Sequence, residues 1–229
     1  MQKLTSELQR LYLFADQQRD AQSIELVRDG MVRTLVIDFH KAAEERHWAH
    51  LCDVANALQT ELGLPAPAVS VSGGECYRLW LSLAQPVTEA QAKQFLALLH
   101  KAYFEDEEID FGRSRVDLPP AQNRTTGLWA AFINPSMGGA LAEDLGLEMA
   151  PPDAAQAAFL EGLVSISEEE YQQALATLQR KHAAVPAPAL NVSTTTPAGL
   201  LLKDATLEDI VRHLHAMGIE PTFRHVLKH

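Results

Sequence analysis

Apolar residues recur with two periods in the first half of the chain, one typical of helices and one typical of strands. The helical spacing predicts an amphipathic helix over residues 3–18, a second helix over residues 48–62 and a third over residues 88–102. Short apolar or alternating runs predict strands, which are residues 31–39, 68–72, 77–83 and 114–118. The chain therefore reads strand, helix, strand, strand, helix, strand after its first helix.

This order of elements predicts an α+β fold. It is the order of the ferredoxin-like or split βαβ core, in which an antiparallel sheet carries helices on one face. The run at residues 128–133 is apolar enough to form another strand. Later helices are expected from about Asp153, after two prolines, and from a capping box formed by Ser167 and Glu170.

The same pattern divides the chain into four expected parts. Residues 1–150 would hold the core with its N-terminal helix, and residues 151–184 a helical extension. Residues 185–198, rich in Pro and Thr, read as a linker. Residues 199–229 would form a small element with a helix from Thr206 to Gly218 and a short strand.

Composition adds that the chain can fold alone in a reducing compartment. With 229 residues and 47% hydrophobic residues, it can bury a sizeable core. No apolar run has membrane-spanning length, and the start MQKLTSELQR lacks the sections of a signal peptide, so we expect a cytoplasmic protein that does not bind a membrane. Two cysteines, Cys52 and Cys76, are too few for a disulfide framework.

Charge limits the mode of nucleic-acid binding. A formal net charge of −11 argues against a general electrostatic grip on DNA or RNA, because such binding needs many phosphate-neutralising cations. It leaves room for a local basic groove. The segments that hold the candidate site residues described below contain four arginines, which are Arg78, Arg113, Arg115 and Arg124.

Three residues form a candidate cation site. Asp38 ends a buried apolar strand, where a carboxylate is costly unless it is paired or bound to a cation, although it could also turn to water or cap a loop. His40 follows two positions later and shares its face. Asp117, in the expected last strand of the core, could converge with Asp38 to hold Mg²⁺ or Mn²⁺. The alternative for Asp117 is a surface ion pair with Arg115.

The segment SVSGGECYRLW is a candidate anion site. Gly73 and Gly74 allow backbone conformations that point successive N–H groups at an anion, and Arg78 follows them in the next strand. The same residues also suit a simple hairpin turn followed by an exposed arginine. Residue types alone leave both interpretations open.

The runs LVIDFH, SVSGGECYRLWLSLAQPV and RVDLPPAQNRTTGLWAAF together resemble the catalytic core of the archaeo-eukaryotic primase superfamily, the primase-polymerases of replication, repair and many plasmids. That family has an RRM-like core. Its motifs are an apolar strand ending in Asp-x-Asp, a Ser-Gly-Gly-x-Gly-x-His segment, and a later strand with an acid. The resemblance covers roughly residues 30–135 and implies a divergent member of the plasmid or mobile-element kind.

The resemblance implies roles for individual residues. Asp38 and Asp117 would be catalytic and bind the metal, with His40 in the place of a second acid. The residues implied to bind the nucleotide or its phosphates are Ser72, Gly73, Gly74, Arg78, Arg115 and Asn123. Three replacements depart from the family. Cys76 stands in the place of a frequent glycine and His40 weakens a magnesium site, whereas Arg78, in place of a phosphate-contacting histidine, carries a permanent charge.

The implied activity is metal-dependent nucleotidyl transfer on a nucleic-acid template, with nucleotides, nucleic acid and a replication protein as partners. If the departures are disabling, the same fold would act as a noncatalytic module that binds nucleic acid or protein. A third reading is a metal-dependent hydrolase or phosphatase using Asp38 and His40.

Overall fold

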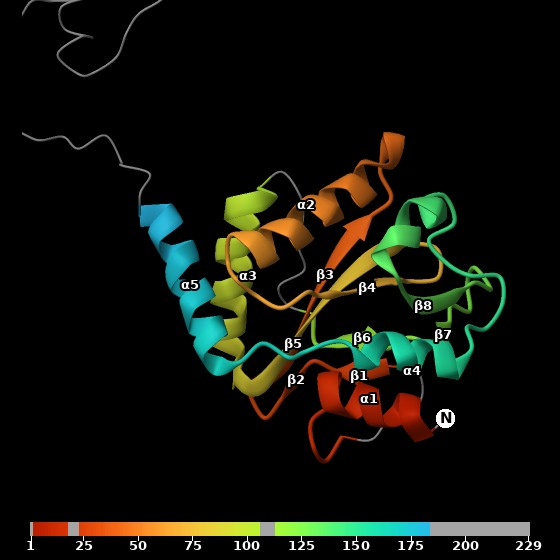
Figure 1. Ribbon diagram of the computed structural model, residues 1–229, viewed down its shortest axis with the longest axis horizontal. Coiled ribbons are helices and arrows are strands. Elements are labelled where there is room, and N and C mark those ends of the chain that lie inside the picture. The colour runs from red at the N-terminus through yellow and green to blue at the C-terminus, as the bar shows by residue number, and fades with distance from the viewer. Residues whose placement is uncertain (1, 18–22, 106–112, 184–229) are drawn as a thin grey trace, which may run out of the picture. The chain divides into compact units, whose positions relative to one another are not determined.

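A six-stranded antiparallel sheet with the strand order β2-β3-β5-β4-β8-β7 organises the protein (Figure 1). The computed structural model describes residues 2–17, 23–105 and 113–183. The strands of this sheet are β2 (Val27–Arg28), β3 (Met31–His40), β4 (Ala68–Val71), β5 (Cys76–Thr88), β7 (Ala121–Gln122) and β8 (Trp129–Ile133). A separate two-stranded ribbon pairs β1 (Ser23–Glu25) with β6 (Arg115–Asp117).

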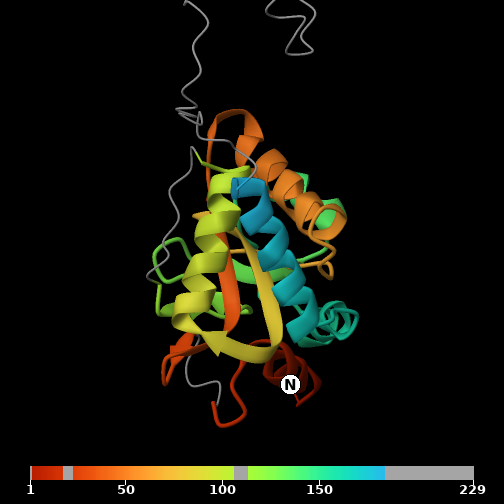
Figure 2. The same ribbon diagram turned by 90° about the vertical axis from the view of Figure 1, so that its left-hand side faces the viewer.

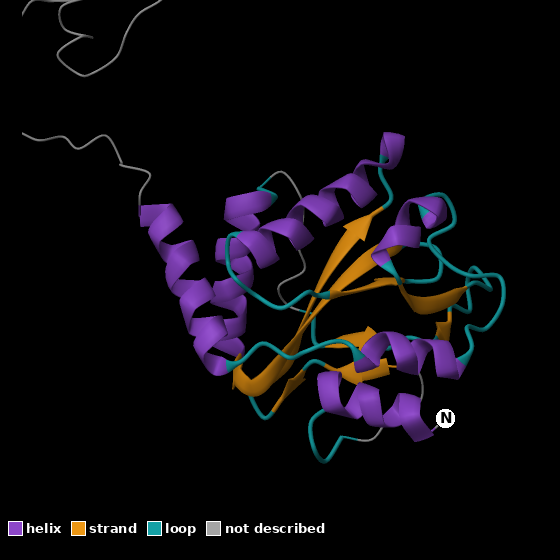
Figure 3. Cartoon of the chain, viewed as in Figure 1, coloured by secondary structure: helices purple, strands orange, loops and turns teal. Residues whose placement is uncertain are grey.

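Helices lie on both faces of the sheet, as Figures 2 and 3 show. They are α1 (Gln2–Tyr12), α2 (Arg46–Thr60), α3 (Glu89–Tyr103), α4 (Asp153–Glu161) and α5 (Glu168–Ala183), with short 3-10 turns η1 (Ala43–Glu45) and η2 (Pro135–Leu141). In the part of the chain described, none of these helices combines the length and apolar character needed to cross a membrane.

Strand alternation builds two separate cores. Odd-numbered positions of β3 and β5, such as Ile37 and Leu79, are buried with α2, α3 and α5 on one face. Even-numbered positions, such as Val36 and Trp80, are buried on the opposite face with α1, α4 and the β1-β6 ribbon. Period-two side-chain direction therefore explains both layers.

The predicted fold class is confirmed: the chain has an α+β fold with a curled antiparallel sheet, compatible with a ferredoxin-like core and helical additions. The β3-α2-β4-β5-α3 segment follows the expected order, and α3 begins at a capping box formed by Thr88 and Gln91. Ser167 and Glu170 form the second expected box at α5. The sequence predicts helices on one face of the sheet, and α2 and α3 form that layer. Helices α1 and α4 add a second layer on the other face.

The last expected core strand is the main correction. Residues 115–117 form β6, but β6 pairs with β1 in the ribbon instead of joining the sheet beside β3. At this edge of the sheet, β2 pairs only with Met31 and Val32 at the start of β3, and it leads into β3 through a tight turn at Asp29 and Gly30, both with positive φ. The partner of β6 is therefore β1, and the expected pairing of this strand with the sheet is not formed.

The first helix is also shorter than expected. It ends at Tyr12 instead of residue 18, and the guanidinium of Arg33 donates hydrogen bonds to the carbonyl oxygens of Arg10 and Leu13. These bonds satisfy carbonyl groups at and just beyond the helix end, which helical bonding no longer uses. The expected linker and the helix from Thr206 fall outside the described residues.

Candidate functional site

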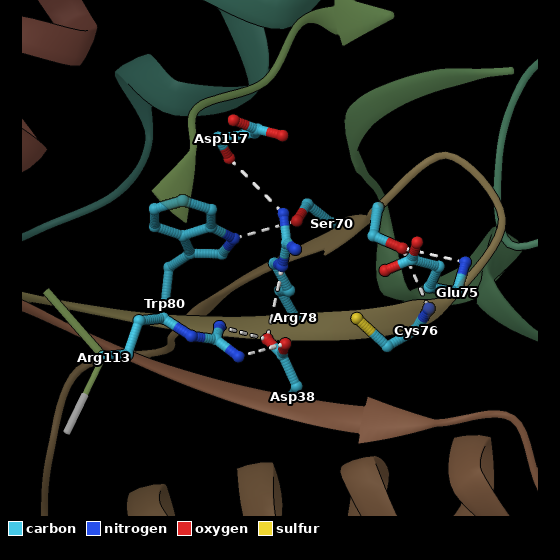
Figure 4. Close-up of polar contacts among 9 residues, drawn as sticks. Asp38, Ser70, Glu75, Cys76, Arg78, Trp80, Arg113 and Asp117 are labelled. Carbon is cyan, nitrogen blue, oxygen red and sulfur yellow. Dashed lines mark hydrogen bonds and ion pairs between the residues drawn. The ribbon is translucent and has the colours of Figure 1, made fainter. Parts of the chain in front are cut away.

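The candidate site lies on the sheet face that carries α1 and α4, where this face changes from apolar to polar. Strand register aligns Asp38 of β3 with Arg78 of β5, and Arg78 with Ser70 of β4. One row away, Trp80 is opposite Val36 and donates its indole N–H to Ser70 Oγ at 2.8 Å. The polar row is therefore held against a buried aromatic side chain (Figure 4).

Two guanidinium groups hold the carboxylate of Asp38. Arg113 donates from Nη1 to Oδ1 at 2.8 Å and from Nη2 to Oδ2 at 2.5 Å, a bidentate arrangement. Arg78 Nε donates to Oδ1 at 3.2 Å. The Asp38 side chain is 8% exposed, against 12% for Arg78 and 21% for Arg113, so these ion pairs are largely shielded from water.

Electrostatics keeps this carboxylate ionised. Burial is the largest single influence and opposes ionisation, but the hydrogen bonds and charge of Arg113, together with the charge of Arg78, outweigh it and lower the pKa of Asp38. Burial, reinforced by the negative charge of Asp38, raises the pKa of the neighbouring Cys76 thiol to about 12. The centre thus contains one carboxylate, two guanidinium groups and a neutral thiol.

The other two proposed metal ligands are placed differently from Asp38. Asp117 reaches the cluster through its backbone, because Arg78 Nη1 donates to the Asp117 carbonyl oxygen at 3.5 Å, while the residue itself is exposed (Figure 4). His40 is exposed at the end of β3. The structure therefore brings Asp38 and Arg78 together and gives Asp117 a main-chain role beside them.

The donor set does not fit a divalent cation. A metal on Asp38 would compete with Arg113 for both carboxylate oxygens and would lie beside the positive charge of Arg78. Across residues 2–17, 23–105 and 113–183, no group of three or more His, Cys, Asp or Glu side chains could hold a metal ion. No chemical step is assigned to Mg²⁺ or Mn²⁺ in this arrangement.

The glycine turn is bonded within the protein. The N–H groups of Gly73 and Gly74 both donate to the carbonyl oxygen of Leu145 at 2.9 Å. Ser72 Oγ accepts from the N–H groups of Glu75 and Cys76 at 3.0 and 2.8 Å. In this conformation, the amides expected to cradle a phosphate instead fasten a loop to the sheet.

The remaining predicted residues lie on the segment that crosses this end of the sheet. Asn123 Oδ1 accepts from the backbone N–H groups of Thr125 and Thr126, so it shapes its own turn. Arg115 is exposed, donates to Ser23 Oγ at 3.3 Å and forms an ion pair with Glu25 at 4.0 Å, so its acidic partner is Glu25 and not the alternative partner Asp117. Arg124 is exposed on the same segment.

Sequence reasoning assigned no role to Arg113, which makes the strongest contacts of the site. Arg113 belongs to no predicted motif, and in the sequence it stands out only as one of four arginines that could form a local basic groove. Its partner Asp38 is distant in sequence, so the pairing depends on how the chain crosses the sheet. Ser70 was likewise missed, because its role depends on the cross-strand position of Trp80.

The ion pairs of Asp38 predict a pH dependence of stability. A carboxyl whose pKa is lowered by folding stabilises the native state above its unfolded pKa of about 4, and this stabilisation is lost as pH falls through the folded pKa. We expect the difference in unfolding free energy between the wild type and Asp38→Asn to be constant above about pH 5 and to shrink below about pH 4. Urea titrations of both proteins at pH values from about 7 down to about 2 measure this difference; a difference that stays unchanged down to about pH 2 would contradict the ion-pair assignment.

Comparison with known proteins gives a distant structural neighbour. No protein-family model and no curated protein sequence matches the chain. The polymerase domain from Mycobacterium tuberculosis ligase D in complex with DNA is similar with a TM-score of 0.37 and 17% sequence identity, over 70% of this chain and 58% of that chain. This chain thus spans less than two thirds of that neighbour. A likeness at this level carries no argument about function.

Proposed function

We propose that the chain is a noncatalytic, primase-polymerase-like module that binds a nucleic-acid strand, and that it serves a replication or mobile-element system. The observation that carries the noncatalytic part is the engagement of Asp38. Both of its oxygens accept hydrogen bonds from Arg113, and Arg78 adds a second guanidinium. An acid held in this way stabilises the sheet and is not presented to a metal-bound nucleotide.

The binding part is supported by the segment that crosses the polar end of the sheet. Arg113 on this segment is committed to Asp38, whereas Arg124 is exposed and Arg115 is exposed with only a 4.0 Å surface pair to Glu25. Exposed guanidinium groups bind phosphates in a bidentate manner. Because the whole chain carries a net charge of −11, binding would be weak and would depend strongly on salt.

The catalytic alternative is metal-dependent nucleotidyl transfer, with Asp38 and Asp117 as the metal-binding acids and His40 assisting. It requires Arg113 to leave Asp38 and the carboxylate of Asp117 to turn toward it. The contacts made by Asp38 and the backbone role of Asp117 favour the noncatalytic module.

Fluorescence anisotropy with a labelled single-stranded oligonucleotide tests the proposed binding surface. We expect the Arg115→Ala/Arg124→Ala double variant to bind about tenfold more weakly than the wild type at low salt, and the salt dependence of binding to become shallower. Each arginine removed takes away one phosphate contact, so both changes follow from counterion release.

A charge-matched variant supplies the control. Lys101→Ala/Arg180→Ala removes the same charge from exposed positions on α3 and α5 and should leave binding within about twofold. If both double variants weaken binding equally, the effect is one of overall charge, and the proposal that Arg115 and Arg124 bind the nucleic acid is contradicted. Absence of binding by the wild type at low salt would contradict nucleic-acid binding itself.

A further inference from the structure

A cleft opens on the other side of β3 from the Asp38 cluster, between the end of that strand and α2. Its volume is about 370 Å³, within the range of small-molecule sites. The described residues that line it are Phe39, His40, Ala42, Arg46, His47, Ala49, His50 and Asp53. It lies outside the Asp38 cluster, although Phe39 and His40 belong to the LVIDFH run and His40 was an expected metal ligand.

The inner wall of the cleft is a set of fixed rings. His47 is buried, accepts at Nδ1 from the Ala42 N–H and donates from Nε2 to the Ala142 carbonyl oxygen, both at 3.2 Å. His50 donates from Nε2 to the Tyr103 carbonyl oxygen at 3.3 Å and meets Phe39 edge-on, with 5.7 Å between ring centroids. These contacts hold the rings in place before any ligand arrives.

The rim carries polar groups of opposite charge. Arg46 is exposed at the first turn of α2 and uses Nε to bind the Ala43 carbonyl oxygen at 3.3 Å. Asp53 is exposed two turns further along the same helix, and within the described residues it has no ion-pair partner. Ala49 lies between them, and its small side chain keeps the space open.

We propose that this cleft binds a nucleoside monophosphate. The phosphate would pair with Arg46, with exposed His40 beside it. The planar base would contact the ring wall of Phe39 and His50, because aromatic faces and edges suit a flat heterocycle. An amino or imino donor of the base would bond to the carboxylate of Asp53. A nucleoside monophosphate carries an anionic phosphate at one end, a flat base, and a hydrogen-bond donor at the far edge of the base. These groups match Arg46, the ring wall and Asp53 of the cleft.

Ligand titrations of the full chain, followed by NMR, test the proposal with the four ribonucleoside 5′-monophosphates, inorganic phosphate and the uncharged nucleosides. We expect at least one monophosphate to bind with a Kd of about 1 mM or tighter, and about tenfold more tightly than phosphate or its own nucleoside. Ala49→Phe should fill the cleft and weaken binding at least about tenfold, and Arg46→Glu should do the same by charge reversal.

The matched control is Ala97→Phe, the same change at an exposed position of α3, which should leave affinity within about twofold. The Arg115→Ala/Arg124→Ala variant should also bind the mononucleotide normally, which separates this cleft from the strand-binding surface. The proposal is overturned if no saturable binding is seen up to about 10 mM ligand, roughly ten times the expected Kd. It is also overturned if phosphate binds as tightly as any monophosphate, or if Ala49→Phe binds as well as Ala97→Phe.

Discussion

Replacing Asp38 by alanine is expected to lower the free energy of unfolding by about 3–5 kcal/mol, the largest effect of any single side chain in the site. The change leaves the guanidinium groups of Arg78 and Arg113 shielded from water without their counter-charge. Urea denaturation at neutral pH measures the loss. Because the partners are known, a double-mutant cycle with Arg113→Ala should give a coupling energy above about 1 kcal/mol.

Asp117→Ala supplies the control for this prediction. Its carboxylate is on an exposed residue, and the contact with Arg78 uses the backbone, which the substitution keeps. We expect a change within about 0.5 kcal/mol. If Asp38→Ala and Asp117→Ala cost the same, Asp38 is not the centre of a buried ion-pair cluster.

Replacing Gly73 by alanine is expected to cost about 2–4 kcal/mol, because it combines backbone strain with overpacking. Gly73 has φ +87°, and a Cβ there would lie 3.0 Å from both the Asn123 Cβ and the Leu128 carbonyl oxygen. Neither neighbour is the flexible end of a long side chain, so the backbone must shift. Thermal and urea unfolding measure the loss.

Gly127→Ala separates the two contributions. Gly127 has a similar φ of +77°, but a Cβ added there would meet no atom within 4 Å, so only the backbone strain, about 1 kcal/mol, remains. The loss of unfolding free energy in Gly73→Ala beyond that in Gly127→Ala then measures how tightly the glycine turn packs against the neighbouring loops. Equal costs at both positions would contradict the close packing.

The central elements of the fold were predictable because each carries a strong local signal. The apolar run of β3, the stripe from Trp48 along α2 and the capping box at Thr88 each define an element without help from the rest of the chain. Their order then predicts the topology of the β3-β5-β4 centre. Strand β6 was predicted at residues 114–118, but β1 and its pairing with β6 were not predictable, since three-residue strands leave little pattern and their partners are chosen by tertiary packing.

The candidate site was predictable only in part. The sequence singled out Asp38 and Arg78 separately, but the register that places them opposite each other, with Ser70 beside Arg78, comes from the structure. The decisive contact, from Arg113 to Asp38, joins distant parts of the chain and has no local signature. For the same reason, the glycine turn could be expected as a turn, whereas the bonds from its amides to Leu145 could not.

Nucleotide incorporation on a primed template is the most direct test of the noncatalytic assignment. The wild-type chain and Asp38→Asn are compared with Mg²⁺ and with Mn²⁺, under conditions where circular dichroism shows both to be folded. The contacts between Asp38 and its two arginines predict that the wild type extends no more primer than Asp38→Asn or a protein-free reaction. Metal-dependent extension by the wild type that Asp38→Asn abolishes would contradict the assignment and establish the enzyme.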